Sequence, residues 1–392
     1  MIKKLFLALI VLFVMVFGGD FEDGVSAYQA GEHQKAAMLF EKAAEDGDVN
    51  AQNNLGVMYE NGKGVKRDYQ KAALFFRKAA EQGDSDAQYN LGVMYDHGLG
   101  VDRDYQKAAA LYKKAADQGI AAAQTNLGSM YLDGEGVRKD DQKAAVLFQK
   151  AAAQGHATAL TILGVMYEYG QGVRQDDKKA AECYRKAADQ GTVEVQVILG
   201  GMYESGRGVR QDYQKAAKCY RQAAEQGLAE AQTKLGSMYL DGKGVSRDDQ
   251  KAAILFRKAA DQGHARAQTI LGGMYAYGQG VMQDYQKAAE CYKKGAEQGY
   301  AMAQSNLGDM YLDGRGVQQD YQKAATLYRK AADQGIASAQ FYLGMMYLKG
   351  KGVQPDHQKA VDFLKKAADQ GIHKAQYILD TLCKENPLVC TS

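Results

Sequence analysis

The stretch LGVMYENGKGVKRDYQKAALFFRKAAEQG, residues 55–83, decides the fold of this chain. Its first third places Leu55, Met58 and Tyr59 at i, i+3 and i+4, which is the spacing of one apolar helix face. The Gly-Lys-Gly triplet at 62–64 then interrupts the pattern, because glycine is a poor helix former that favours tight turns. We therefore expect a helix that ends just before this triplet.

A second helix is expected in the rest of the stretch. Asp68 is placed to be its N-cap, where a carboxylate accepts hydrogen bonds from free backbone amides of the first turn. Phe75 and Phe76, together with alanines at helical spacing, give this helix an apolar face, and Gly83 ends it as a C-terminal cap. The stretch therefore predicts an antiparallel helical hairpin.

The Gly-Lys-Gly triplet has a second interpretation, a phosphate-binding loop. Such a loop needs Gly-x-x-x-x-Gly-Lys-Ser/Thr between a strand and a helix, so that backbone amides and the lysine converge on phosphate. Here a helix is expected before the glycines, no hydroxyl residue follows Lys63, and Glu135 occupies the same slot in another copy. A carboxylate would repel phosphate, so we interpret the glycines as a turn.

The hairpin pattern repeats with a period of 36 residues. Nine complete copies fill residues 51–374 without an insertion or a deletion. A single hairpin cannot bury its own apolar faces, so the copies are expected to stack on one another. The Ala-Gln pair that starts most copies recurs at residues 51, 87, 123, 231, 267, 303, 339 and 375.

These copies, of which residues 55–83 are the first, resemble the Sel-one-like repeat family, a longer relative of the tetratricopeptide repeat. The resemblance implies an all-α fold, a right-handed α/α superhelical solenoid built from antiparallel helix pairs. It also implies a scaffold that binds other proteins, and not an enzyme.

The chain divides into four expected regions. Residues 1–18 are expected to be a signal peptide and residues 19–50 an N-terminal capping hairpin similar to a tetratricopeptide unit. The nine repeats occupy 51–374, and residues 375–392 form a C-terminal capping helix and tail.

The first region carries a short positive start, Lys3 and Lys4, before an apolar run from 5 to 17. A membrane-spanning helix needs roughly 20 apolar residues, so a cleaved secretory signal explains the run better than a permanent anchor. We expect cleavage near Gly18, export to the periplasm or the exterior of a bacterium, and no membrane span in the mature chain.

The balance of charged residues indicates which class of partner the chain binds. The formal net charge is +2, and basic and acidic residues are interspersed along the chain. Without a basic face, nucleic acid is not an expected partner. We expect a monomer that binds a protein or peptide.

No residue pattern predicts catalysis. Asp68 and Lys71 recur as a pair in every complete copy, and helix capping accounts for the aspartate without an active site. No serine has lysine three positions later, the pattern of the serine β-lactam enzymes, and the six histidines lack metal-binding spacing. The sequence therefore predicts no enzyme, no cofactor and no metal.

The five cysteines fall into two groups. Cys183, Cys219 and Cys291 occupy one position of three different copies, where other copies have leucine or phenylalanine, so we expect buried thiols. Cys383 and Cys390 are close in sequence near the C-terminus, and we expect them to form a disulfide in an oxidising compartment.

The variable positions of each first helix are the candidates for ligand binding. Positions are counted from the first residue of each copy, which is the alanine of the Ala-Gln pair in most copies. The third, seventh and eleventh positions are spaced i, i+4 and i+8, opposite the fixed apolar stripe. By resemblance to tetratricopeptide arrays, this face lines a concave groove, and its mixture of side chains suits a polypeptide or a glycan. The alternative is neutral drift on a solvated surface. The candidate residues are Asn53, Asn61, Tyr89, His97, Asp133, Tyr169, Tyr277, Asp309, Asp313, Phe341 and Lys349.

The sequence thus predicts an exported scaffold that binds proteins through this groove, in envelope assembly or on a host protein. The second hypothesis is a protein that binds peptidoglycan or β-lactams, or that modifies the cell wall. A third is a subunit that regulates an enzyme.

Overall fold

The computed structural model describes residues 19–385, and every regular element in this range is a helix. The chain divides into two compact units, one that ends at Thr192 and one that begins at Val193. The N-terminal unit begins with a helical segment at 19–29. It continues with α2 (His33–Glu45), α3 (Val49–Asn61), α4 (Tyr69–Glu81), α5 (Ser85–His97), α6 (Tyr105–Asp117), α7 (Ala121–Asp133), α8 (Asp141–Ala153), α9 (Ala157–Tyr169) and α10 (Asp177–Asp189).

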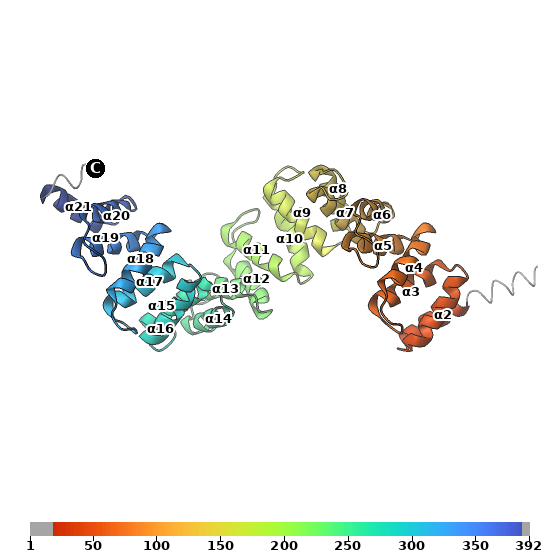
Figure 1. Ribbon diagram of the computed structural model, residues 1–392, viewed down its shortest axis with the longest axis horizontal. Coiled ribbons are helices and arrows are strands. Elements are labelled where there is room, and N and C mark those ends of the chain that lie inside the picture. The colour runs from red at the N-terminus through yellow and green to blue at the C-terminus, as the bar shows by residue number, and fades with distance from the viewer. Residues whose placement is uncertain (1–18, 386–392) are drawn as a thin grey trace, which may run out of the picture. The chain divides into compact units, whose positions relative to one another are not determined.

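Between residues 193 and 385, the C-terminal unit contains eleven further helices, which are labelled in Figure 1. They are α11 (Val193–Ser205), α12 (Tyr213–Glu225), α13 (Ala229–Asp241), α14 (Asp249–Asp261), α15 (Ala265–Tyr277), α16 (Tyr285–Glu297), α17 (Ala301–Asp313), α18 (Tyr321–Asp333), α19 (Ala337–Lys349), α20 (His357–Asp369) and α21 (His373–Glu385). Within each unit consecutive helices pack against one another. The predicted all-α solenoid of stacked hairpins is confirmed in both units.

In each second helix, the aspartate of the Asp-x-x-Lys pair caps the N-terminus, and the lysine lies over a tyrosine ring of the first helix. Asp104 Oδ1 accepts a hydrogen bond of 3.0 Å from the backbone amide of Lys107, and this bond lowers the pKa of the Asp104 carboxyl. The Lys107 ammonium lies 3.1 Å from Asp104 Oδ2 and 5.3 Å from the centroid of the Tyr95 ring. The same cap recurs in every second helix from α4 to α20, which confirms the predicted capping role.

The glycine inside each first helix makes room for a side chain of the facing helix. A Cβ atom placed on Gly56 would lie 2.6 Å from the Phe76 ring, which is closer than real contacts allow. Each first helix thus accepts the roughly 1 kcal/mol propensity cost of glycine so that a ring or a leucine can pack on its backbone. The close contact that this glycine permits is chiefly with a side chain of the facing helix.

The glutamine of the Ala-Gln pair forms a buried polar link that sequence analysis did not anticipate. Gln88 is 4 % exposed, and its Nε2 donates to the Ala80 carbonyl of the preceding helix at 3.3 Å. Its Oε1 accepts a 2.9 Å bond from Gln118, which follows the next second helix. Because a buried amide without partners is costly, the link favours one register of stacking. Leu160 replaces this glutamine in one copy.

The cysteine expectations are met in part. Cys219 is buried, whereas Cys183 and Cys291 are half-buried free thiols whose pKa is raised to about 11 by desolvation. The prediction of a buried thiol is therefore wrong for these two, because their helix face lies only partly under the neighbouring hairpin. Cys383 is disulfide-bonded. Its predicted partner Cys390 lies outside the described residues, so that pairing stays a prediction.

The expected signal peptide, residues 1–18, also lies outside the described residues. Among residues 19–385, no helix combines the length and apolar content that a membrane crossing requires.

Candidate functional site

The C-terminal unit contains a cavity of about 660 Å³ among its last two hairpins and α21. A second cavity of about 50 Å³ lies beside it, and Arg315 lines both. We call the larger one the C-terminal cavity. Its lining consists of Leu312, Asp313, Arg315, Gln319, Tyr321, Phe341, Tyr342, Met345, Met346, Lys349, Lys351 and Lys374.

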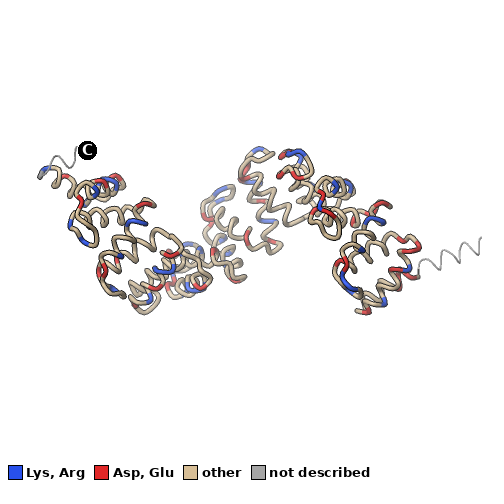
Figure 2. The backbone as a smooth tube through the Cα atoms, in the orientation of Figure 1, with Lys and Arg blue, Asp and Glu red and all other residues tan. Residues whose placement is uncertain are grey.

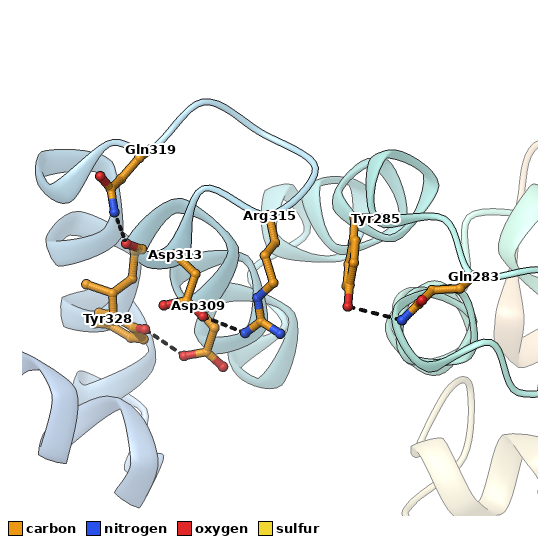
Figure 3. Close-up of polar contacts among 8 residues, drawn as sticks. Gln283, Tyr285, Asp309, Asp313, Arg315, Gln319 and Tyr328 are labelled. Carbon is orange, nitrogen blue, oxygen red and sulfur yellow. Dashed lines mark hydrogen bonds and ion pairs between the residues drawn. The ribbon is translucent and has the colours of Figure 1, made fainter.

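Arg315 is positioned by the two glycines that flank it. Gly314 ends α17 with a φ of 70°, and a Cβ atom on Gly316 would collide with the backbone carbonyl of Tyr285. The loop therefore passes directly over the start of α16. As a result, the Arg315 guanidinium forms an ion pair with Asp313 and lies 5.9 Å from the centroid of the Tyr285 ring (Figure 3).

Asp309 is a partly buried carboxylate at the base of the same region. The Tyr328 hydroxyl donates to its Oδ1 at 2.6 Å (Figure 3). Desolvation raises the pKa of Asp309, although the bond from Tyr328 opposes that shift. Burial and the nearby Asp309 charge raise the pKa of Tyr328, so this phenol keeps its proton as a donor. The pair is thus a fixed polar contact between α17 and α18.

Aromatic rings form one wall of the C-terminal cavity. Tyr342 stacks on Tyr328 with ring centroids 5.4 Å apart, and it meets Phe341 edge-on at 5.3 Å. Tyr342 is 37 % exposed, and burial is the main cause that raises the pKa of its hydroxyl. Rings arranged in this way offer a rigid apolar surface with a polar edge.

Cations surround this aromatic wall. Lys351 Nζ lies 5.0 Å from the centroid of the Tyr321 ring, and Lys374 Nζ lies 5.9 Å from that of Phe341. With Lys349 and Arg315 the lining holds four cations, and Asp313 is its one carboxylate. Elsewhere basic and acidic residues are interspersed along both units (Figure 2). The cavity is therefore a local concentration of positive charge beside apolar rings.

The structure brings five of the predicted site residues into this region. Asp313, Phe341 and Lys349 line the C-terminal cavity. Tyr277, which is 81 % exposed, and Asp309 line the small cavity next to it. They come from three successive first helices, α15, α17 and α19, as the eleventh, seventh and third positions predict.

The other predicted residues belong to the N-terminal unit and line neither cavity. Some are used inside the scaffold: Asn53 accepts a 3.1 Å bond from Asn90, and the Asn61 amide donates to its own helix. The remainder include one half-buried side chain, Tyr89, and three exposed ones, His97, Asp133 and Tyr169.

The third position differs from expectation in most copies. Thr125, for example, is 3 % exposed, because it bonds the Ala121 carbonyl at 2.8 Å and meets His156 of the next hairpin at 3.1 Å. First helices of neighbouring hairpins pack over this position, so it does not generally face an open groove. It is buried at Thr125, Val197, Thr233, Thr269, Ser305 and Phe341.

Sequence analysis missed Arg315, Tyr342, Lys351 and Lys374. A signal existed for two of them, because Arg315 and Lys351 occupy the variable slot between the paired glycines. That variability was used only to exclude a phosphate loop. In the structure, the side chain between the paired glycines contacts the first residue of the second helix of the previous hairpin. Arg315 lies over Tyr285 of α16, and Lys351 lies over Tyr321 of α18.

The side chains that line the two cavities are suited to noncovalent binding of a ligand. Residues 19–385 contain no group of three side chains suited to a metal ion. The carboxylates near the cavities are paired, Asp309 with Tyr328 and Asp313 with Arg315. Cations beside aromatic rings attract an anionic or aromatic ligand without a covalent step.

Comparison with protein families gives a match over most of the chain. The family model of the Sel1 repeat matches ten segments, which include the predicted N-terminal hairpin. The matched residues are 21–48, 49–84, 85–120, 121–156, 157–192, 193–228, 229–264, 265–300, 301–336 and 337–372.

Two solved structures are similar over most of their length. The protein c5321, described as a protective antigen present in uropathogenic Escherichia coli strains that displays an SLR fold, is 39% identical, with a TM-score of 0.90. That match covers 93% of this chain and 79% of c5321. A Sel1 repeat protein from Oxalobacter formigenes is 35% identical, with a TM-score of 0.64, and covers 78% of this chain and 89% of its own.

A curated relative shares a much shorter segment. The protein named "Putative beta-lactamase HcpE" from Helicobacter pylori is 44% identical over 45 residues. The match spans 12% of this chain and 13% of that protein.

Proposed function

Since the chain belongs to the Sel1 repeat family, we propose that it is an exported adaptor that binds other proteins through its C-terminal unit. The family and the fold are those of repeat scaffolds. In such arrays the framework residues hold hairpins together, and binding depends on side chains that vary between copies. The adaptor would act in envelope assembly or on a host protein.

One observation carries the binding proposal: variable side chains meet at cavities only partly filled by the scaffold. Tyr277 projects with 81 % exposure, and Tyr342 and Lys349 line the C-terminal cavity. Aromatic residues are enriched at protein interfaces, where a rigid ring adds contact area at a small entropic cost. The backbone and side chains that line these cavities are already ordered in the scaffold, which limits the entropic cost of binding.

Site-specific crosslinking tests this proposal. A photoreactive phenylalanine analogue placed at Tyr277, expressed in the native bacterium and irradiated in culture, should yield a protein adduct that mass spectrometry identifies. The matched control is Tyr169, which holds the same repeat position in α9, is 73 % exposed and lines neither cavity. If Tyr169 gives the same adducts as Tyr277, or if Tyr277 gives none, the binding face is wrongly assigned.

Export rests on residues 1–18, whose basic start and short apolar run suit a cleaved signal. The description of c5321 as an antigen supports it, because an antigen must be reached by the immune system. Cell fractionation and N-terminal sequencing of the mature chain test the proposal. Full-length chain retained in the cytoplasm would contradict it.

A cell-wall role is the second proposal, favoured by the short similarity to the protein named as a β-lactamase. No serine of this chain is followed by lysine at the third position, so binding of muropeptides is the more reasonable form of it. Turnover of a chromogenic cephalosporin, or retention on purified peptidoglycan, would support this role over the adaptor.

A further inference from the structure

The C-terminal cavity holds more positive charge than its own scaffold neutralises. Arg315 is paired with Asp313. Among residues 19–385, Lys349, Lys351 and Lys374 form no ion pair with a carboxylate. Three ammonium groups around one cavity repel each other, and a ligand with carboxylates would relieve that repulsion.

Only the last complete copy has lysine both at the eleventh position and in the slot between the glycines, as Lys349 and Lys351. Lysines of the repeated Asp-x-x-Lys motif lie close to their capping aspartates, as Lys323 does at 3.3 Å from Asp320. Lys243 occupies the same slot between glycines as Lys351, but it lies 3.3 Å from Asp241. In the last complete copy, Lys349 stands at the position that Asp241 has beside Lys243. Lys351 is therefore repelled by its neighbour, whereas Lys243 is attracted by Asp241.

The walls between these lysines are apolar. Phe341, Met345 and Met346 line the cavity together with the ring of Tyr342. A bare anion such as phosphate would leave Met345 and the exposed part of the Tyr342 ring in contact with water. A volume of about 660 Å³ lies within the roughly 300–1,000 Å³ range of pockets that bind ligands of moderate size. The complement to this cavity is an apolar side chain with negative charge on both sides.

We infer that the C-terminal cavity binds an acidic peptide segment in which an aromatic or aliphatic side chain lies between carboxylates. The apolar side chain packs on Tyr342 and Met345, and the carboxylates pair with Lys349, Lys351 and Lys374. This inference rests on the proposed function, because it names the chemistry of the protein segment that the adaptor would hold.

Binding of a defined probe tests the inference on the full mature chain. The probe is the fluorescein-labelled peptide Glu-Asp-Phe-Asp-Glu, and the equally labelled control is Gln-Asn-Phe-Asn-Gln, which has nearly the same shape without the four side-chain carboxylates. Fluorescence anisotropy at low ionic strength should show at least tenfold tighter binding of the acidic peptide, and this difference should shrink as salt screens the charges.

The matched variants are Lys349→Gln/Lys351→Gln/Lys374→Gln and Lys243→Gln. The triple variant should bind the acidic peptide at least tenfold more weakly, whereas Lys243→Gln should bind as the wild type does. Circular dichroism checks that both variants melt within a few degrees of the wild type.

Four results would overturn the inference. They are no binding of the acidic peptide, equal binding of both peptides, undiminished binding by the triple variant, and tighter binding of a ten-nucleotide oligothymidine through the same lysines. A Tyr277 crosslink to a protein, together with any of these results, would leave the adaptor standing and remove only the acidic ligand. Acidic-peptide binding without any crosslink would support the ligand chemistry and count against the adaptor.

Discussion

Two hairpins, one in each unit, bind the hydroxyl of a buried tyrosine with a carboxylate of the first helix, but the carboxylate stands at a different repeat position in each. In the N-terminal unit, the buried Tyr184 hydroxyl donates to Glu168 on α9, 2.8 Å away, at the tenth position of the copy that starts at residue 159. In the C-terminal unit, Tyr328 donates to Asp309 on α17, 2.6 Å away, at the seventh position of the copy that starts at residue 303. Both tyrosines pack on a helix glycine, so each hydroxyl emerges near the same helix and needs an acceptor there.

The choice of position changes the surface. With Asp309 serving as the acceptor, the tenth position of α17 is free to be Leu312, which lines the C-terminal cavity. In α9 the tenth position holds the acceptor Glu168, and Val165 occupies the seventh. A shift of one carboxylate by a single helical turn therefore adds an apolar residue to the cavity lining without loss of the buried hydrogen bond.

The largest effect is expected when the acceptor is removed. Asp309→Val gives α17 the residue that α9 has, but it leaves the buried Tyr328 hydroxyl without the carboxylate. An unsatisfied buried polar group costs about 1–3 kcal/mol. We expect the unfolding free energy of the C-terminal unit to fall by about 2 kcal/mol on this scale, as measured by urea denaturation of the full chain.

A second substitution should restore the bond in its other position. Asp309→Val/Leu312→Glu copies the arrangement of Val165 and Glu168, so it should recover most of the lost stability. It should also place a carboxylate at the cavity and weaken binding of the acidic probe peptide. A double variant no more stable than Asp309→Val would contradict the equivalence of the two positions.

The helix glycines should show the next largest effect. A Cβ on Gly164 would lie 2.5 Å from the Tyr184 ring, which its bond to Glu168 holds in place. A Cβ on Gly128 would lie 2.9 Å from the Phe148 ring, which has no such bond. Overpacking costs about 1–3 kcal/mol, and alanine regains about 1 kcal/mol of helix propensity.

Gly164→Ala should therefore lower the melting temperature of the chain, and Gly128→Ala should change it less. Calorimetry of the two variants under one buffer condition makes the comparison. A larger loss in Gly128→Ala would show that the tyrosine bond does not fix its ring.

A smaller effect is expected in the pH dependence of stability. Burial raises the pKa of Asp309 above its ordinary 3.8, so the folded state holds this proton more tightly than the unfolded state. The contribution of Asp309 is therefore most favourable below pH 3.8 and declines as pH rises through the raised value. Asp309→Asn removes this dependence.

The measurement is the difference in unfolding free energy between wild type and Asp309→Asn at several pH values. It should move in favour of the variant as pH rises from about 3 to about 6. A difference that stays constant, or moves toward the wild type, would show that the carboxyl is not destabilised by burial.

The smallest effect on stability is expected at the cavity rim. Lys351→Gln removes one cation from the face of the Tyr321 ring, an interaction worth about 0.5–1 kcal/mol at exposed sites. Its midpoint in urea should barely change while its affinity for the acidic peptide falls. A large loss of stability would mean that Lys351 belongs to the framework.

The sequence predicted the framework well because the framework is periodic. Asp68 and Gly62 recur in register, and each acts on its own hairpin, so local rules for capping and turns were sufficient. The buried Gln88 link was not recognised, because its partners come from two other helices. Contacts of that kind depend on how hairpins stack, which a helical repeat pattern does not specify.

The site was harder to predict for the same reason. Asp313 and Lys349 were found because their position varies between copies, but variability alone did not separate them from residues of the N-terminal unit. Lys374 lies on α21, two hairpins after Arg315, and only the stacking brings both to one cavity. The third position varies as well, yet it is mostly buried, because neighbouring first helices pack over it.

Hydrogen exchange of the full chain, with and without saturating Glu-Asp-Phe-Asp-Glu peptide, tests most directly whether the last hairpins alone form the site. Slower exchange is predicted in α19, in its following glycine loop at 350–352 and at the start of α21. The equivalent loop of the N-terminal unit, residues 98–100, should exchange at an unchanged rate. Equal protection of both loops, or protection confined to the N-terminal unit, would contradict the account.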